Sequence, residues 1–451
     1  MLFSSVPFLY WFLPIILLLY FVVPKKGKNL VLLLASLSFY YYGEPKYMYV
    51  MLGSTFCAFI FGLIIDKAKR KKIPMVISLS ISLAFLLVFK YTDFFIGNLQ
   101  GLGFEIAFLK LALPIGISFY TFQAMSYTVD LYKGQAKVQT NIINFACYIS
   151  FFPQLIAGPI VRYTTIEDQL KNRVHSIEKF SDGAFRFTVG LGKKVLIANV
   201  LGEFCEKYTS SNEQTALFAW GWAIAYSMQI YFDFSGYSDM AIGLGKIFGF
   251  DFPENFDYPF ISTSITEFWR RWHMSLGSWF RDYVYIPLGG NRVKLARWIF
   301  NIAVVWFLTG FWHGASWNFI LWGLYFAVFL VLEKFIKLKT PNFIKHVYLV
   351  LFVVISFVIF ASTDTNTLIS NFSMLFSFDN LINKETLYYM QSYLYIFVIG
   401  FIGVTPLVKN IAKKGGKIQT VLQPISMVLI LILVTAFLVK GSFNPFLYFR
   451  F

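Results

Sequence analysis

Long apolar runs separated by short polar connections constrain this chain more than any other feature. A helix needs about 20 apolar residues to cross the hydrocarbon layer of a bilayer, and such runs recur along the whole sequence. Only 14% of the residues are charged, compared with roughly 25% in a soluble domain. The sequence therefore predicts an all-α membrane protein, because helices satisfy their own backbone hydrogen bonds in lipid.

The predicted spans differ in how clearly they are delimited. The apolar runs cover residues 6–23, 30–42, 47–65, 74–96, 111–129, 142–160, 185–200, 216–232, 298–312, 317–332, 344–361, 393–408 and 421–439. Several are short or contain proline, glycine or lysine, as at Pro114 and Pro153, so they could be broken or re-entrant. With this allowance, we expect a polytopic bundle of roughly eleven spans in one continuous membrane domain.

The net charge of +16 is distributed in short basic clusters between the apolar runs, at residues 25–28, 67–72, 334–339 and 409–417. Basic residues gather in the cytoplasmic loops of membrane proteins. The charge therefore indicates topology and no nucleic-acid partner. Because the first cluster follows the first run, we expect the N-terminus outside. The polar region 362–391 contains few basic residues, and we interpret it as an outside loop.

Residues 230–320 contain many charged side chains between apolar runs. Such side chains must line a cavity, pair with one another or lie at the membrane interface. Within this region, residues 264–285 carry an apolar stripe at helical spacing, formed by Phe268, Trp272, Leu276, Trp279 and Phe280. We predict one amphipathic helix here that lies at the interface or dips into it.

The sequence contains four histidines, His175, His273, His313 and His346, and His313 differs from the others. His175 lies in a polar loop and His346 beside Lys345 at the edge of a span, so we interpret both as solvated. His313 lies in an apolar Phe-Trp-His-Gly-Ala-Ser-Trp run. A buried imidazole needs hydrogen bonds and can exchange a proton near neutral pH, so structural and catalytic roles remain equally open. With no histidine or carboxylate at i+3 or i+4, we predict no metal site.

Three long motifs surround these histidines: Glu267 to Leu276, Trp279 to Arg292, and Trp312 to Trp317. Two further runs, at 152–163 and 231–243, support them. Together they resemble the membrane-bound O-acyltransferase (MBOAT) family. More narrowly, they resemble its bacterial branch that acetylates alginate and peptidoglycan and includes the D-alanine transfer protein of teichoic acids. The Pro-Leu-Gly-Gly run at 287–290 favours the acetyltransferase side.

The resemblance implies an MBOAT fold over residues 1–451, with re-entrant and interfacial helices and the catalytic motifs at about 230–335. The invariant histidine of the family corresponds to His313 and its second polar residue to His273. A base about 3 Å from a hydroxyl takes its proton during attack on a thioester. His313 is the expected base, and His273 the expected orienting group or oxyanion donor. Arg270, Arg271 and Arg281 are expected to attract phosphates of CoA or lipid headgroups.

The resemblance also implies how the reaction is arranged across a bacterial inner membrane. The donor would be acetyl-CoA or another acyl thioester, with no permanently bound cofactor. The acceptor would be a cell-surface polysaccharide, reached through an extracytoplasmic acyltransferase partner, since we predict no large outside domain to hold a glycan.

Asp233 and Asp239 are expected to pair with the arginines of the motifs. Tyr448 in the aromatic C-terminal tail is a further candidate acyl carrier.

Two other functions remain open. One is D-alanyl transfer from a carrier protein to teichoic acid. The other is a transporter or flippase in which His313 relays protons, with which the broken spans at Pro114 and Pro153 are compatible. Inverted sequence repeats would favour a transporter, and the sequence shows none.

Overall fold

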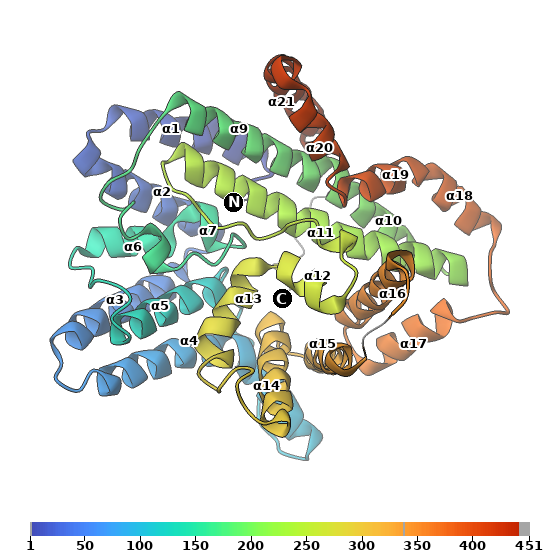
Figure 1. The fold of residues 1–451 in the computed structure, drawn as a ribbon, viewed down its shortest axis with the longest axis horizontal. Helices are drawn as coiled ribbons and strands as arrows, with labels where there is room; N and C mark the ends of the chain where they lie inside the picture. The colour runs from blue at the N-terminus through green and yellow to red at the C-terminus, as the bar shows by residue number, and fades with distance from the viewer. Residues whose placement is uncertain (1, 337–338, 442–451) are drawn as a thin grey trace. The chain divides into compact units, whose positions relative to one another are not determined.

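The computed structural model describes residues 2–336 and 339–441, and every regular element in these ranges is helical (Figure 1). The chain forms two compact units, one of Met1–Phe187 with Asp239–Pro253 and one of Thr188–Ser238 with Glu254–Phe451. Helices α9 and α11 contribute residues to both units. The prediction of an all-α protein is confirmed.

The first unit is built mainly from α1 to α9. Its helices are η1 (Phe8–Phe12), α1 (Leu13–Val22), η2 (Lys25–Gly27), α2 (Lys28–Gly43), α3 (Met48–Lys67), α4 (Lys72–Gly101), α5 (Ile117–Tyr132), α6 (Ile142–Ser150), α7 (Phe152–Leu155), α8 (Tyr163–Ile166) and the first part of α9 (Ile177–Gly192). Helices α3, α4 and α5 pack against one another (Figure 1). Residues 111–116 of one predicted span precede α5, because Gly116 adopts φ 75° immediately before the helix begins.

The second unit contains the polar motifs. Its helices are η3 (Lys193–Ala198), α10 (Asn199–Ser210), most of α11 (Ala216–Ile247), η4 (Pro259–Ile261), α12 (Ile265–Arg271), α13 (Met274–Phe280), η5 (Arg281–Tyr285), α14 (Leu295–His313), α15 (Trp317–Phe335), α16 (Asn342–Ala361), α17 (Thr365–Leu375), α18 (Lys384–Ser392), α19 (Leu394–Gly403), α20 (Leu407–Lys414) and α21 (Gly416–Val439). The region 362–391, which we interpreted as a loop, contains α17 and most of α18.

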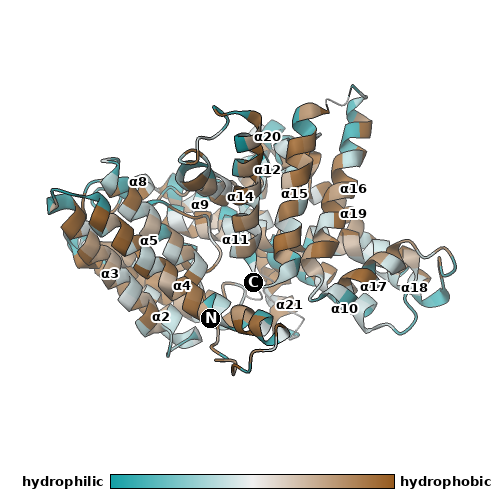
Figure 2. Cartoon of the chain, turned by 90° about the horizontal axis from the view of Figure 1, so that it is seen from below, coloured by the Kyte–Doolittle hydropathy of each residue, from teal (hydrophilic) through white to brown (hydrophobic). Residues whose placement is uncertain are grey.

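Among the described residues, six helices are long and apolar enough to cross a membrane: α3, α4, α14, α15, α16 and residues Ile418–Val439 of α21. The pair α18 and α19, bent by 51°, would add a seventh span. These helices match predicted apolar runs, and the chain is a multi-pass membrane protein. Figure 2 shows the mainly apolar residues of α15 and α16. The larger number of about eleven spans stays a prediction.

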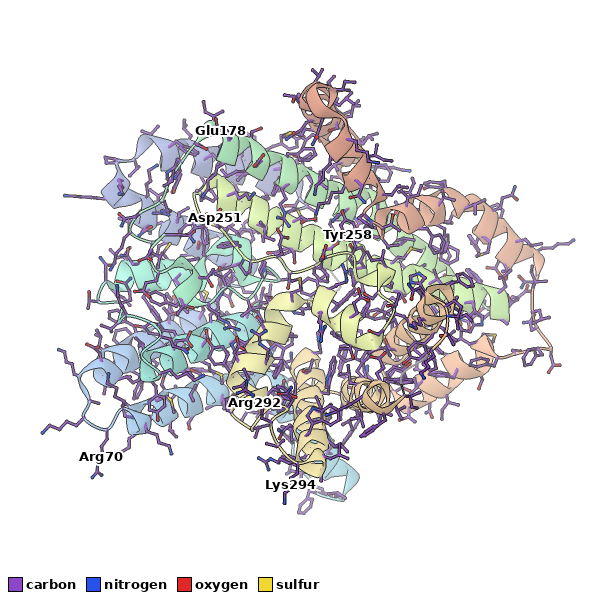
Figure 3. All side chains as sticks on the ribbon, in the orientation of Figure 1. Arg70, Glu178, Asp251, Tyr258, Arg292 and Lys294 are labelled. Atoms are coloured by element: carbon purple, nitrogen blue, oxygen red, sulfur yellow. The ribbon has the colours of Figure 1, made fainter. Side chains whose placement is uncertain are left out.

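Basic side chains lie in the connections at the ends of several of these helices. Arg70 lies between α3 and α4, and its side chain points away from the helices (Figure 3). Arg292 and Lys294 lie before α14 and are also exposed (Figure 3). Charged side chains at helix ends can reach the polar interface of a bilayer, so this placement is compatible with membrane-spanning helices.

Candidate active site

The backbone N–H groups at the start of helix α12 have hydrogen-bond partners. The Ser264 side chain accepts a hydrogen bond from the Glu267 backbone N–H at 3.0 Å. Glu333, near the end of α15, accepts from the backbone N–H groups of Ile265 at 2.6 Å and Thr266 at 2.9 Å. The first N–H groups of a helix have no partner within it, so Ser264 and Glu333 stabilise the start of α12 and fasten it to α15.

The chain does not continue as one helix through residues 264–285, so that prediction is wrong. Helix α12 ends at Arg271, and α13 begins at Met274 after His273, which adopts a left-handed conformation with φ 44° and ψ 50°. The backbone carbonyl of Asn255 accepts from the Met274 N–H at 3.0 Å and supports this break. The predicted apolar stripe is buried inside the protein and does not face lipid: Phe268, Trp272, Leu276, Trp279 and Phe280.

Asn255 also orients the His273 side chain. Its Oδ1 atom lies 3.1 Å from His273 Nδ1, 3.3 Å from the Ser275 backbone nitrogen and 2.9 Å from the Ser275 hydroxyl. A backbone N–H can only donate, so the shared Asn255 atom must be the amide oxygen, and His273 Nδ1 must donate to it. The neutral His273 ring therefore carries its lone pair on Nε2.

The two histidines of the motifs lie close together in the second unit. Their ring centroids are 6.4 Å apart, and the residues are only 1% and 6% exposed, for His273 and His313 respectively. Phe234 of α11 packs edge-to-face on His273 with ring centroids 4.6 Å apart. Burial, together with the nearby His313, holds the pKa of His273 well below its usual value. His273 is therefore expected to be neutral.

His313 is the last residue of α14, where this helix lies very close to α15. A Cβ added at Gly310 or Gly323 would overlap the backbone of the facing helix, so only glycine permits this approach. Trp322 of α15 packs edge-to-face on His313 with ring centroids 5.0 Å apart. The buried indole N–H of Trp322 has no acceptor within residues 2–336 and 339–441. A hydrogen-bond donor is thus available beside His313.

The three arginines of the motifs have different surroundings. Arg271 forms ion pairs with Glu267 and Asp257, each at 3.1 Å. Arg281 pairs with the carboxylate of the next residue at 2.7 Å. Arg270 is exposed, and no described residue forms an ion pair or hydrogen bond with it. Within the described part of the chain, carboxylates engage Arg271 and Arg281 but not Arg270.

Two aspartates of α11 pair with basic residues other than the arginines of the motifs, so the expected pairing is wrong. Lys194 binds Asp233 at 2.8 Å, with side chains only 3% and 4% exposed, and also donates to Asn199 at 2.9 Å. Arg186 binds Asp239 at 2.9 Å. These contacts join α11 to α9 and η3. The paired residues lie far apart in the sequence, so no local pattern predicted the contacts. The Lys194–Asp233 pair is buried, whereas the Arg186–Asp239 pair is partly exposed.

The remaining candidates are distributed over both units and beyond the described residues. His175 is exposed, as predicted, and its Nε2 lies 2.9 Å from the hydroxyl of Tyr20. His346 is partly buried, contrary to the prediction, and its Nδ1 lies 3.1 Å from the carbonyl of Ser262. Tyr448 lies outside the described residues. Within the described part of the chain, no three His, Cys, Asp or Glu residues are placed to hold a metal ion.

Asn255 was not among the residues predicted for the site, since no motif in the sequence marks it. We expect Asn255→Ala to lower acyl transfer by about 100-fold, because His273 would lose its orienting partner. Asn255→Asp should keep the acceptor but stabilise the imidazolium, which raises the pKa of His273. If neutral His273 is required, the acidic limb of the pH–rate profile should move to higher pH.

The control for this experiment is Asn301→Ala, which removes another buried amide that donates to the Gly290 carbonyl at 3.1 Å. A purely structural role for Asn255 predicts equal losses in both alanine variants and an unshifted profile in Asn255→Asp. Either result would contradict a positioning role.

Comparison with known proteins relates this chain to acyl-transferring enzymes. The sequence model of the membrane-bound O-acyltransferase family matches residues 133–372. A probable alginate O-acetylase AlgI of Pseudomonas putida is 38% identical over all of both chains. A peptidoglycan O-acetyltransferase of Helicobacter pylori is 36% identical over 76% of this chain and 72% of its own. A teichoic acid D-alanyltransferase of Bacillus subtilis is 33% identical over 49% and 59%. The family match includes both histidines of the site.

Proposed function

Because this chain belongs to the membrane-bound O-acyltransferase family and is an O-acyltransferase, we propose that it transfers acetyl groups for the O-acetylation of an extracytoplasmic polysaccharide. The observation that carries the proposal is the pair of buried histidines, with ring centroids 6.4 Å apart, within the matched region. Relatives named for alginate and peptidoglycan acetylation align over more of this chain than the D-alanyltransferase does. This difference favours acetyl over D-alanyl transfer.

In the proposed reaction, an acceptor hydroxyl attacks the carbonyl carbon of a thioester. The new C–O bond forms, the C–S bond breaks, and the hydroxyl proton must pass to a base before reaching the departing thiolate. One hydroxyl group between rings separated by 6.4 Å can lie within hydrogen-bonding reach of both His273 and His313. We propose His313 as the base for this hydroxyl.

The hydrogen bond to Asn255 supports an accepting role for His273 more than a donating one. Since Nδ1 is engaged, Nε2 of the neutral ring can orient a hydroxyl or accept a proton but cannot donate. A separate donor is then needed for the oxyanion of the tetrahedral intermediate. The buried Trp322 N–H beside His313 is a candidate for this donor.

The donor and the path across the membrane complete the proposal. We propose cytoplasmic acetyl-CoA as the donor substrate, with Arg270 as the arginine best placed to attract its phosphates, since no described residue engages it. The enzyme would lie in a bacterial inner membrane with its N-terminus outside, and a separate extracytoplasmic acyltransferase would complete transfer to the polysaccharide. This partner is proposed because the region that we expect outside, 362–391, is short.

The decisive experiment supplies radiolabelled acetyl-CoA to inverted membrane vesicles that contain the full chain and isolated cell-wall or secreted polysaccharide. We expect thioester-dependent label on protein or polysaccharide inside the vesicles, and none when the chain is absent. A D-alanyl carrier protein serves as the second donor. Transfer only from that carrier, or substrate movement without any thioester, would overturn the proposal in favour of the D-alanyl or transporter alternative.

A further inference from the structure

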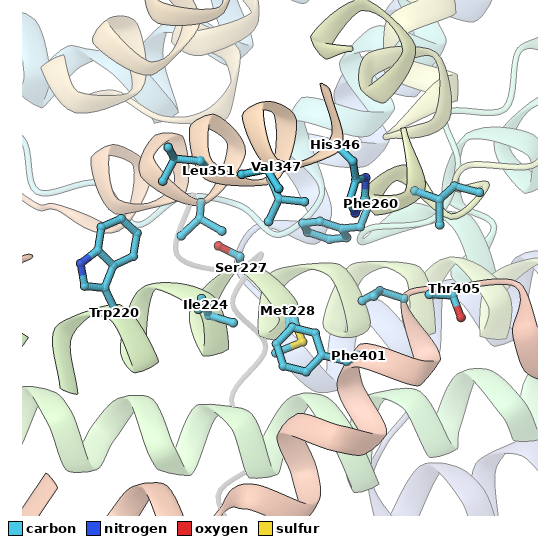
Figure 4. Close-up of a pocket in the computed structure, with 14 residues that line it drawn as sticks. Trp220, Ile224, Ser227, Met228, Phe260, His346, Val347, Leu351, Phe401 and Thr405 are labelled. Carbon is cyan, nitrogen blue, oxygen red and sulfur yellow. The ribbon is translucent and has the colours of Figure 1, made fainter. Parts of the chain in front are cut away.

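A cavity of about 440 Å³ lies within the second unit, between α11, α16, α19 and η4 (Figure 4). This volume falls within the roughly 300–1,000 Å³ range of sites that bind small molecules. Its walls are mainly apolar and include Ile224, Met228, Val350, Val354 and Val404. Neither histidine of the acyl-transfer site lines it, so the cavity is not part of that site.

The cavity opens to the outside of the protein between two apolar helices. Val347 and Leu351 of α16 and Phe401 of α19 line it and are 48%, 40% and 54% exposed. Helix α16 is long and apolar enough to span a membrane, so these side chains would meet lipid. A hydrocarbon chain from the bilayer could therefore enter without crossing water.

The two ends of the cavity differ in polarity. Figure 4 shows Trp220 at one end and His346 and Thr405 at the other. His346 lies with its Nδ1 atom 3.1 Å from the Ser262 carbonyl. An elongated ligand with an apolar tail and a polar head matches this arrangement.

Positive charge gathers beside the polar end. Helix α20 begins two residues after Thr405 and carries the exposed lysines Lys409, Lys413 and Lys414. The ammonium group of Lys409 lies 5.7 Å from the ring centroid of Tyr258, which immediately precedes η4 at this end. The nearby acid, Asp257, already pairs with Arg271 at 3.1 Å.

Helix α20 also carries exposed apolar residues, Leu407, Val408 and Ile411, between its lysines. Helices with basic and apolar faces lie in the interface of a membrane, where lysines attract anionic lipids. The basic cluster 409–417 is also expected on the cytoplasmic side, whose leaflet is rich in such lipids.

We propose that this cavity binds one acyl chain of an anionic glycerophospholipid, with the phosphate headgroup at His346, Thr405 and the lysines of α20. The apolar walls would hold the chain, and the charge complementarity would select an anionic headgroup. The inference does not depend on the proposed donor or acceptor, because the cavity and the histidine pair have no lining residue in common.

The test uses the full-length protein in phosphatidylcholine nanodiscs that contain a phosphatidylglycerol analogue with a photoreactive group on one acyl chain. We expect crosslinks on α16 and α19, displaced by unlabelled phosphatidylglycerol but not by added phosphatidylcholine. Val350→Trp should reduce labelling roughly tenfold by filling the cavity. The matched control Val328→Trp changes an exposed residue of α15 that does not line the cavity and should leave labelling unchanged.

Three outcomes would overturn the proposal. Equal labelling in Val350→Trp and the wild type would place the lipid elsewhere. Equal competition by phosphatidylcholine would indicate that the analogue labels the protein from the surrounding bilayer without selectivity for its headgroup. Stronger competition by a polyprenyl phosphate would assign the cavity to a different occupant. Replacement of Lys409, Lys413 and Lys414 by glutamine should remove the preference for phosphatidylglycerol while leaving crosslinks at α16.

Discussion

His313→Ala is expected to reduce acyl transfer by about 100-fold to 10,000-fold, the range associated with a positioned general acid or base. The imidazole lies only 6% exposed at the end of α14, with His273 as its neighbour at 6.4 Å between ring centroids. Alanine removes the proposed base while α14 and α15 keep their close glycine contact. Initial rates with labelled acetyl-CoA in inverted vesicles measure the effect.

Loss of activity must be separated from loss of folding. His313→Gln retains a polar side chain of similar size without a basic nitrogen, and it should be as inactive as alanine. His175→Ala changes an exposed histidine of the first unit and should retain wild-type rates. Near wild-type activity in both His313 variants would exclude His313 as the base. Thermal unfolding in detergent should show that the variants remain folded.

Lys194→Met is expected to destabilise the second unit by about 3–5 kcal/mol, because it removes a cation that pairs with the buried Asp233 carboxylate. The two side chains lie 2.8 Å apart and are only 3% and 4% exposed. Asp233 also lies next to Phe234, whose ring packs on His273. The free energy of unfolding in mixed detergent micelles measures this loss, and reduced acyl transfer should accompany it.

Two further variants test the explanation. Lys179→Met breaks an ion pair of similar length, 2.7 Å, whose side chains are 32% and 55% exposed, so it should cost only about 0.2–1 kcal/mol. Adding Asp233→Asn to Lys194→Met should recover part of the stability, because the buried charge is then removed as well. Equal costs for Lys194→Met and Lys179→Met would show that burial of the pair does not matter.

Much of the helical framework was predictable because membrane spans depend on local composition. The apolar run at 47–65 lies within α3 except for its first residue, the run at 317–332 lies within α15, and the run at 344–361 lies within α16. Hydropathy identifies such helices well, since lipid accepts apolar side chains on every face. The predicted span at 111–129 was less accurate, because its first six residues precede α5, which begins directly after Gly116.

The helical spacing in residues 264–285 misled the prediction for a physical reason. Spacing shows that apolar side chains share a face, but it does not show whether lipid or protein covers that face. Trp272 packs against Phe357 of α16, with ring centroids 5.4 Å apart, and is buried. The break at His273 depends on Asn255, which lies 18 residues away in sequence. Neither contact has a local sequence signal.

The membrane class and the principal spans followed from the sequence alone, and the resemblance of its motifs to the acyltransferase family singled out His273 and His313. Apolar runs and motifs are properties of contiguous sequence, so these features do not depend on long-range packing. The tautomer of His273, the Lys194–Asp233 pair and the cavity beside α20 emerged only from the folded chain. Each requires side chains from separate helices to meet at hydrogen-bonding or van der Waals distance, and long-range packing sets those distances.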